Sequence, residues 1–372
     1  MARILIVIFI FVVSACSLTS SLTIRGKGNI KLQQVDYEEV PGWEKDDHSK
    51  ALLSFLNSCE KFASMGNSRL IGAQIGDIRV IDFRDVCDIG GAIKGMSSKQ
   101  AKNFFENWFA PFKVSSKGGN SNGLFTGYYE PEIRGSKVKT DTYKYPVYAK
   151  PKDSGGSSYS RREIEEGALA DKKLELLYVE DKVDLFFLHV QGSGRVILPD
   201  GATVKITYDG KNNQPYTSIG NYIIENNLIK EGGTSYDKIK LWLKNNPEKA
   251  NEVMNVNASY IFFKITDKEY VVGAQGTPLI AERSLAVDND IMPYGFPIWV
   301  NTKIKNKENT GYSSYQKLLV TQDAGSAIKG VVRGDIFFGR GSGAEKMAAS
   351  MNSLGNYYIF LPINVVDKFS GR

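Results

Sequence analysis

The stretch DAGSAIKGVVRGDIFFG, residues 323–339, is the most informative part of this chain for both fold and chemistry. Asp323 ends the apolar run LLVTQ, and Asp335, 12 positions later and after a stretch with three glycines, begins a second apolar run, IFF. Both runs have the length and composition of β-strands, so the two carboxylates can project from one rim of a sheet. Asp288, in RSLAVDNDIMPYG, is a third candidate. Aspartate beside a strand is often only a turn residue, so spacing does not choose among the three.

The chain around this stretch is rich in short β-like runs from about residue 123 onward. These runs are apolar or alternating and are interrupted by Gly, Pro and Asn, which predicts strands. They are LFTGYYEP (124–131), YPVYAKP (145–151), DLFFLHVQGSGRVILPDG (184–201), TVKITYDG (203–210), SYIFFKI (259–265), YVVGAQ (270–275), FPIWVNT (296–302), KLLVTQD (317–323), GDIFFG (334–339) and YYIFLP (357–362).

Helices are predicted at the periphery. Residues 48–63 and 97–109 place apolar side chains on one helical face, and the second segment begins with a capping box formed by Ser97 and Gln100. Shorter helices are predicted at 160–166, 219–228, 235–243 and 344–350. The fold class is therefore mainly β with peripheral helices.

The N-terminus MARILIVIFIFVVSAC is typical of an export signal, residues 1–15. Its apolar run is shorter than the roughly 20 residues that a membrane-spanning helix needs. Val13, Ser14, Ala15 and Cys16 resemble a lipobox, which predicts lipidation of Cys16 and an anchor on the periplasmic side of the outer membrane. A plain signal peptide with an incidental cysteine is the alternative.

The two remaining cysteines, Cys59 and Cys87, would then lie in an oxidising compartment. An isolated pair there favours a disulfide over a metal site. Two buried free thiols are the alternative, because nothing in the sequence fixes the distance between them.

Several kinds of chemistry are disfavoured. The formal charge of +6 is mild and the lysines are scattered, which argues against nucleic acid but suits an anionic polymer. His48 and His189 lack metal-ligand spacing, and GSG (192–194) lacks the outer glycines of a hydrolase nucleophile elbow. The turn GRGSGA (339–344) imitates a dinucleotide motif, but too little chain follows it. We therefore expect neither a metal nor a cofactor.

Carboxylate chemistry remains, and it is the usual means of breaking glycosidic bonds. Five motifs together resemble the membrane-bound lytic murein transglycosylase A family, in order along the chain. They are TGYYEP (126–131), HVQGSGRV (189–196), YDGKNNQPYTSIG (208–220), RSLAVD (283–288) and DAGSAIKGVVRGDIFFG (323–339). The sequence has Ser326 where this family usually has glycine.

The resemblance implies a double-psi β-barrel domain from residues 16–127 and 267–372, with a second β-domain, residues 128–266, inserted into it. A glycan strand would bind in the groove between the two. The implied partners are peptidoglycan strands and the membrane, with other cell-wall enzymes as candidates.

The resemblance also assigns roles to residues. Asp335 maps onto the family's catalytic aspartate, and Asp323 would support it. Asp335 would protonate the oxygen between N-acetylmuramic acid and N-acetylglucosamine, then deprotonate the C6 hydroxyl that forms a 1,6-anhydro sugar. Candidates for sugar contacts are Tyr128, Gln191, Ser193, Tyr208 and Lys329.

Two other functions remain open on the same scaffold. One is an inverting peptidoglycan hydrolase in which Asp323 or Asp288 activates water. The other is a non-catalytic, expansin-like protein that binds the cell wall.

Overall fold

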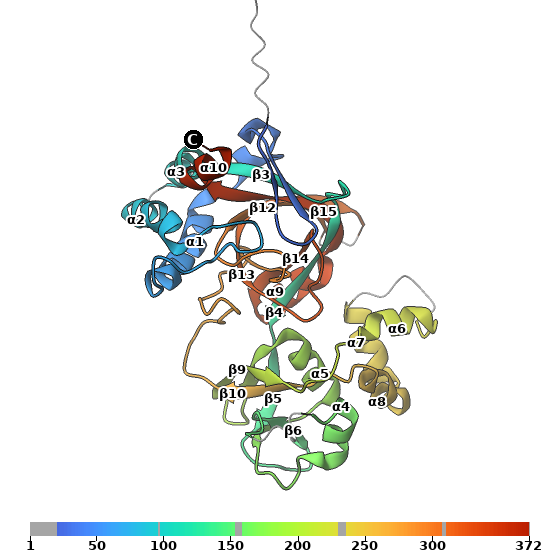
Figure 1. Cartoon of the computed structure of the whole chain (residues 1–372). Coiled ribbons are helices and arrows are strands. Elements are labelled where there is room, and N and C mark those ends of the chain that lie inside the picture. Colours follow the sequence, from blue (N-terminus) through green and yellow to red (C-terminus); the bar gives the residue numbers. More distant parts are fainter. Residues whose placement is uncertain (1–20, 96, 153–157, 230–235, 307–309, 372) are drawn as a thin grey trace, which may run out of the picture.

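The computed structural model describes residues 21–95, 97–152, 158–229, 236–306 and 310–371. The expected signal peptide and Cys16 lie outside these residues. Two sheets organise the chain, one of nine and one of six strands, in agreement with the mainly β prediction (Figure 1). Within the described ranges, no helix has the length and apolarity needed to cross a membrane.

The larger sheet uses strands from both ends of the chain, in the order β1-β2-β3-β15-β12-β13-β11-β14-β4. The bounds of its strands are β1 (Thr23–Arg25), β2 (Ile30–Gln34), β3 (Phe109–Ser116), β4 (Gly123–Glu130), β11 (Ser284–Ala286), β12 (Pro297–Lys305), β13 (Tyr312–Asp323), β14 (Arg333–Arg340) and β15 (Asn352–Pro362). We call this sheet and its helices the large lobe.

The pairings of the large lobe return to their starting strand. The long β15 pairs with β12 and β3 along its second half, and its first half pairs with β4. The path β15-β12-β13-β11-β14-β4 therefore leads back to β15. Gly123 and Gly355 face each other at the β4–β15 pairing. A Cβ on Gly123 would lie 1.5 Å from the carbonyl oxygen of Val332, so only glycine fits there.

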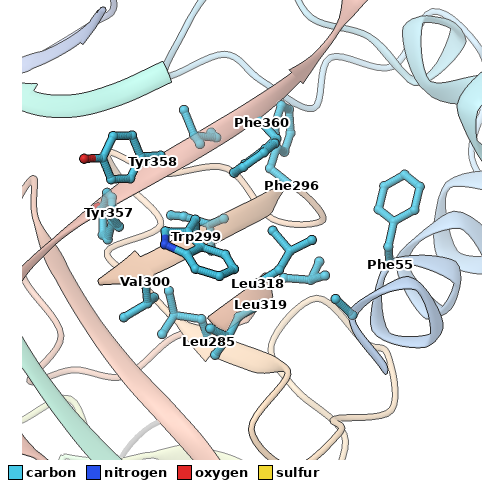
Figure 2. Close-up of a cluster of buried hydrophobic side chains, with 14 of the residues drawn as sticks. Phe55, Leu285, Phe296, Trp299, Val300, Leu318, Leu319, Tyr357, Tyr358 and Phe360 are labelled. Atoms are coloured by element: carbon cyan, nitrogen blue, oxygen red, sulfur yellow. The ribbon is translucent and has the colours of Figure 1, made fainter. Parts of the chain in front are cut away.

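The core of the large lobe lies between these strands and three helices near the N-terminus. Trp299 and Leu318 are fully buried on β12 and β13, and Phe55 reaches the core from α1 (Figure 2). The helices of this lobe are α1 (His48–Ala63), α2 (Arg84–Ala92), α3 (Ser98–Trp108), α9 (Gly341–Ser350) and α10 (Ile363–Ser370). Cys59 in α1 and Cys87 in α2 form a disulfide.

The smaller sheet is built from residues that leave the large lobe after β4 and return before β11. Its order is β10-β9-β8-β5-β7-β6. Its strands are β5 (Glu132–Ser136), β6 (Tyr145–Tyr148), β7 (Glu175–Val179), β8 (Ser193–Ile197), β9 (Thr203–Lys211) and β10 (Ile261–Ile265). We call residues 131–265 the inserted lobe. The boundary expected at residue 128 falls inside β4, which belongs to the large sheet.

The helices of the inserted lobe are α4 (Arg161–Glu163), α5 (Lys182–Gln191), α6 (Ile219–Glu225), α7 (Tyr236–Asn245) and α8 (Pro247–Asn255). The strand predicted for LFFLHVQ is wrong, because these residues form α5. Asp181 caps the start of α5, and Gly192, at φ 78°, ends it. Residues 185–189 are all buried, so no polar face marked the helical period.

The strand predicted for residues 270–275 is also wrong. These residues form only an isolated bridge between Val272 and Pro278. Gly273 lies within this segment, and a Cβ there would come within 2.4 Å of the Gln322 carbonyl. The segment follows β13 closely without becoming part of the sheet ladder.

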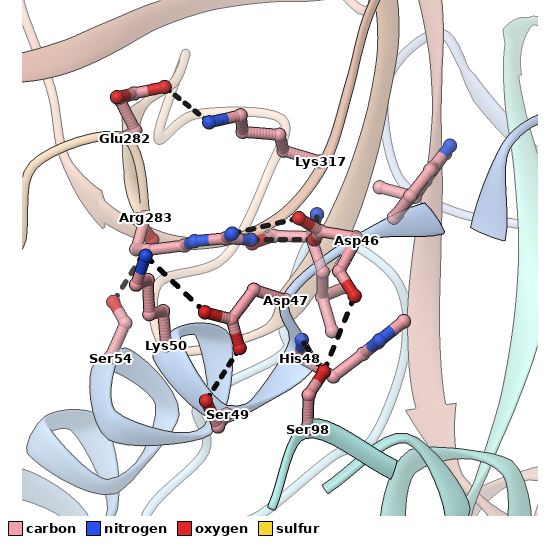
Figure 3. A network of polar contacts seen from close by, with 12 residues as sticks. Asp46, Asp47, His48, Ser49, Lys50, Ser54, Ser98, Glu282, Arg283 and Lys317 are labelled. Carbon is pink, nitrogen blue, oxygen red and sulfur yellow. Dashed lines mark hydrogen bonds and ion pairs between the residues drawn. The ribbon is translucent and has the colours of Figure 1, made fainter. Parts of the chain in front are cut away.

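Buried ion pairs hold the architecture in two places. At the junction of the lobes, Glu130 at the end of β4 is 3.1 Å from both Arg195 and Lys205 of the inserted sheet. In the large lobe, Arg283 makes a two-pronged contact with Asp46, at 2.6 and 2.8 Å, directly before β11 (Figure 3). Both of these side chains are almost fully buried.

Candidate functional site

The two aspartates of the DAGSAIKGVVRGDIFFG motif lie in one row across the large sheet. Ala286 on β11 is in register with Asp323 on β13 and with Asp335 on β14. Asp335 is in turn opposite Thr126 on β4. Residues in register point to the same face of a sheet, and neighbouring strands are about 4.8 Å apart. The row therefore places the backbones of the two aspartates about 10 Å apart, with only a methyl group between them.

The row faces away from the core of the large lobe, because the other face of its strands is buried in that core. Leu285, Ile336 and Phe125 alternate with the row residues on β11, β14 and β4, and all three are fully buried. Their burial against the core fixes which face each strand turns to it. Asp323 and Asp335 keep partial access to solvent on the other face.

Among the residues that the structure describes, one side chain donates a hydrogen bond to the Asp335 carboxyl. The Thr126 hydroxyl donates to its Oδ1 at 2.6 Å. Burial raises the pKa of Asp335, while the charge of Arg333 and the Thr126 hydrogen bond lower it, and the net direction is upward. A carboxyl group with a raised pKa retains its proton closer to neutral pH, as a general acid must.

Asp323 has three donors instead of one. Tyr128 donates from its hydroxyl to Oδ2 at 2.7 Å, and the amides of Ala274 and Ala324 donate to Oδ1 at 2.9 Å. Burial raises the pKa of Asp323, the three hydrogen bonds lower it, and the charge of Asp335 raises it. The net direction is upward, as it is for Asp335, so the direction of the pKa shift does not distinguish the two carboxyls. They differ in their donors, because the three hydrogen bonds to Asp323 all favour its ionised form.

Three further residues surround this pair, and sequence reasoning did not identify them. Thr126 and Arg333 contact each other at 2.8 Å beside Asp335. Tyr216, in the inserted lobe, lies near enough for Asp335 to raise the pKa of its phenol, although burial contributes more. The sequence signal was that all three residues fall in motifs that carry the family resemblance.

Asp288 and Lys329 form a separate structural cluster. Lys329 lies 2.9 Å from Asp288 and 2.8 Å from Asp290, and the Gly330 amide donates to the second oxygen of Asp288. Asp288 is buried. Both of its oxygens are engaged in closing the loop between β13 and β14.

The predicted sugar-contacting residues lie in different settings. Tyr128 packs its ring against Phe337, at 5.2 Å between centroids, and bonds Asp323. Gln191 ends α5 and accepts from the Tyr129 amide at 3.0 Å, which ties the inserted lobe to β4. Ser193 is buried in β8, whereas Tyr208 on β9 is about half exposed. The structure thus brings Tyr128 to the aspartates and leaves Tyr208 open to solvent.

Comparison with known proteins gives consistent matches across the chain. Two family models match, the MltA specific insert domain at residues 124–264 and the 3D domain at residues 283–361. The membrane-bound lytic murein transglycosylase A of Vibrio cholerae is 39% identical over 217 residues, which cover 57% of this chain and 59% of that protein. Its Escherichia coli K12 counterpart is 34% identical over 241 residues, covering 64% and 65%. The matched segment thus spans less than two thirds of these two relatives.

Solved structures match over more of the chain. The membrane-bound lytic murein transglycosylase from Agrobacterium tumefaciens is 30% identical with a TM-score of 0.81, over 92% of this chain and 100% of that one. MltA from Neisseria gonorrhoeae is 32% identical with a TM-score of 0.75, over 92% and 95%. E. coli MltA with bound chitohexaose is 26% identical with a TM-score of 0.69, over 90% and 94%. The chain belongs to the membrane-bound lytic murein transglycosylase A family.

Proposed function

We propose that this protein is a peptidoglycan lytic transglycosylase. It cleaves the β-1,4 bond between N-acetylmuramic acid and N-acetylglucosamine and leaves 1,6-anhydro-muramic ends. The observation that carries the proposal is the environment of Asp335, a partly exposed carboxyl with a raised pKa. Its Oδ1 is bonded, and its Oδ2 has no hydrogen-bond partner among the described residues. The family membership of the chain supports the proposal independently.

The mechanism uses one carboxyl twice. Protonated Asp335 donates to the glycosidic oxygen as the bond to C1 of the muramic acid breaks. The resulting carboxylate then takes the proton of the C6 hydroxyl, whose oxygen bonds to C1. The proton returns to Asp335 and no water is consumed. The C6 hydroxyl is already part of the substrate, so its effective concentration is high.

The contacts of the other aspartates favour this reaction over hydrolysis. An inverting hydrolase needs a second carboxylate free to activate water. Asp323 accepts three hydrogen bonds, and Asp288 is bound by Lys329 and the Gly330 amide. Asp323 instead supports the oxocarbenium-like transition state with its negative charge, about two strand spacings from Asp335.

For the substrate, we propose a glycan strand held between the lobes. E. coli MltA, a chain with the same overall fold, has been solved with bound chitohexaose. Tyr128 and Tyr208 would contact sugars directly. Gln191, Ser193 and Lys329 would shape the surfaces around them, since the Gln191 amide oxygen and the Lys329 ammonium already have protein partners and Ser193 is buried.

The finer features of architecture and location are part of the same proposal. The path of pairings that returns to β15, with parallel β11–β13 and β14–β4 pairs, supports a double-psi β-barrel. The insert-domain match at residues 124–264 supports an inserted domain close to the expected 128–266. A lipid anchor at Cys16 on the periplasmic side of the outer membrane agrees with the membrane-bound names of the relatives.

The test is Asp335→Asn assayed on purified peptidoglycan. Wild-type protein should release fragments whose muramic ends lack one water, as mass spectrometry detects directly. The variant should release none while still binding the polymer. Asp77→Asn is the control, because Asp77 is exposed and distant in sequence from Asp335. Fragments with reducing muramic ends would indicate hydrolysis, and equal release by Asp335→Asn would remove Asp335 from the mechanism.

A further inference from the structure

We infer that Arg333 and Thr126 are positioning residues that fix the acid proton of Asp335 on its Oδ2 oxygen. This inference rests on the proposed function, in which Asp335 is the general acid. It extends that function by assigning the oxygen that gives and regains the proton. It also assigns roles to two residues that do not need to touch substrate.

The first step concerns the direction of the hydrogen bonds. A guanidinium has donors and no acceptor, so the Arg333 Nη2 group must donate to the Thr126 Oγ1 oxygen, 2.8 Å away. Thr126 carries a single hydroxyl hydrogen, which it donates to Asp335 Oδ1 at 2.6 Å. If Oδ1 carried the proton instead, it would be a weak acceptor, and the contact would persist only if the Thr126 hydrogen turned away and Oδ1 donated to the second lone pair of Oγ1. A proton on Oδ2 leaves the observed hydrogen bond as it is.

The second step concerns the rigidity of the arrangement. Arg333 also donates through Nη1 to the backbone carbonyls of Leu124 and Gly334, one on β4 and the other on β14. Thr126 and Asp335 face each other in register on the same two strands. The guanidinium is therefore held by the sheet itself, and it holds the Thr126 hydroxyl in one rotamer.

The consequence is a carboxyl with two unlike oxygens. Oδ1 accepts from Thr126 whether the group is neutral or ionised. Oδ2 accepts no hydrogen bond from the residues that the structure describes, and Asp335 is open to solvent in part. The proton that leaves and returns during the reaction is carried by Oδ2, and the carboxyl does not rotate between the two transfers.

The pH dependence follows from the charges that face Asp335. The charged groups are Arg333 on its own strand and Asp323 on β13, and the neutral titratable groups are the phenols of Tyr128 on β4 and Tyr216 from the inserted lobe. The reaction starts from protonated Asp335, so activity is lost as the pH rises through its pKa. The Thr126 hydrogen bond and the Arg333 charge both stabilise the carboxylate. Removing either interaction raises the pKa of Asp335, so the alkaline fall in the pH–activity profile moves to higher pH.

The experiment compares Thr126→Val and Arg333→Gln with the wild type on peptidoglycan, measuring kcat across pH. Thr126→Val should lower kcat roughly tenfold and move the alkaline limb up by about one pH unit, the size of one hydrogen bond to a charged group. Arg333→Gln should move the limb in the same direction. Because Arg333 acts on Asp335 partly through Thr126 and partly through its own charge, the loss of kcat in the double variant should be smaller than the two single losses combined.

Conservative variants and a control complete the test. Thr126→Ser keeps the hydroxyl and should restore both kcat and the limb. Arg25→Gln removes an exposed arginine on β1 and should change neither. Thermal melting checks that each variant is folded, and Arg333→Gln provides the test if Thr126→Val is not.

Failure of the positioning role and failure of the proposed function give different results. Thr126→Val with a wild-type kcat and profile would overturn the positioning role. Wild-type products with reducing muramic ends would reject the transglycosylase function. The limb shift would still decide the positioning role in that case, because a hydrolase with Asp335 as its acid shows the same limb.

Discussion

Replacement of Asp46 by asparagine should strongly destabilise the large lobe. Asp46 accepts two hydrogen bonds from Arg283, at 2.6 and 2.8 Å, and a third from the Leu318 amide at 2.8 Å. The side chains of Asp46 and Arg283 are 4% and 3% exposed, so solvent cannot replace the lost partner. Asparagine keeps the shape but leaves the guanidinium buried without a counter-charge.

The magnitude follows from that burial. Breaking a buried ion pair by removing one partner costs about 3 to 5 kcal/mol of unfolding free energy. For a domain of this size class, each kcal/mol lowers the melting midpoint by about 2 to 4 °C, so the midpoint should fall by roughly 6 to 20 °C. Arg283 immediately precedes β11, so the loss should also loosen the strand that separates the two aspartates.

The same pair predicts a response to acid. Burial raises the pKa of Asp46, but the hydrogen bonds and charge of Arg283 and the Leu318 amide outweigh it, and the pKa is lowered from 3.8. A carboxylate with a depressed pKa contributes stability that is present above its unfolded value. That contribution is lost as the pH falls below 3.8, and the Asp46→Asn variant should lack this part of the acid dependence.

The assay is calorimetry or circular dichroism melting of the wild type and variants at neutral pH. Asp77→Asn is the matched control, because Asp77 pairs with Arg79 at 2.7 Å but is 57% exposed. An exposed pair of this kind contributes at most about 1 kcal/mol. If Asp46→Asn melts at the same temperature as Asp77→Asn, the argument from burial is wrong.

Three shorter predictions concern other parts of the chain. Replacing Cys59 and Cys87 by alanine should lower the unfolding free energy by about 3.6 kcal/mol, since their separation of 28 residues sets the loop that the disulfide closes. Denaturant unfolding measures this loss, and reduction of the wild type should reproduce it. Asp323→Asn should reduce glycan release roughly 10- to 1000-fold without abolishing it, as the loss of one electrostatic stabiliser does. A total loss equal to that of Asp335→Asn would contradict its supporting role. Lys329→Met should lower the melting midpoint because it leaves buried Asp288 without its cation, whereas an unchanged midpoint with weaker polymer binding would make Lys329 a sugar contact instead.

Much of this fold was predictable where local sequence decides it. The helix predicted at 48–63 matches α1, and the capping box of Ser97 and Gln100 begins α3. Both have polar and apolar faces, because each lies on the surface of the core. The middle of α5, LFFL at residues 185–188, is an unbroken apolar run that is buried throughout, so its period carried no information.

The candidate site was predictable only in part, for a related reason. Asp323 and Asp335 are close in sequence and flank neighbouring runs, so their shared rim could be inferred. Thr126 lies 209 residues from Asp335, and Tyr216 belongs to the other lobe. Contacts of that kind depend on strand register across non-local pairs, which local propensity does not encode. Lys329 is the opposite case, a residue predicted to contact sugar that instead pairs with Asp288. A loop lysine that pairs with a buried aspartate looks the same in sequence as one that faces a ligand.

The row Asp323, Ala286, Asp335 and Thr126 has a consequence for how this family can diverge. Its spacing is set by backbone hydrogen bonds between strands, so substitutions in the core can accumulate without changing the distance between the acidic groups. Insertions and deletions are different. Loss of a single residue within β11 would turn Ala286 to the other face and place its neighbour between the carboxylates. Descendants of this sequence should therefore vary in length freely in the loops and hardly at all within β11, β13 and β14.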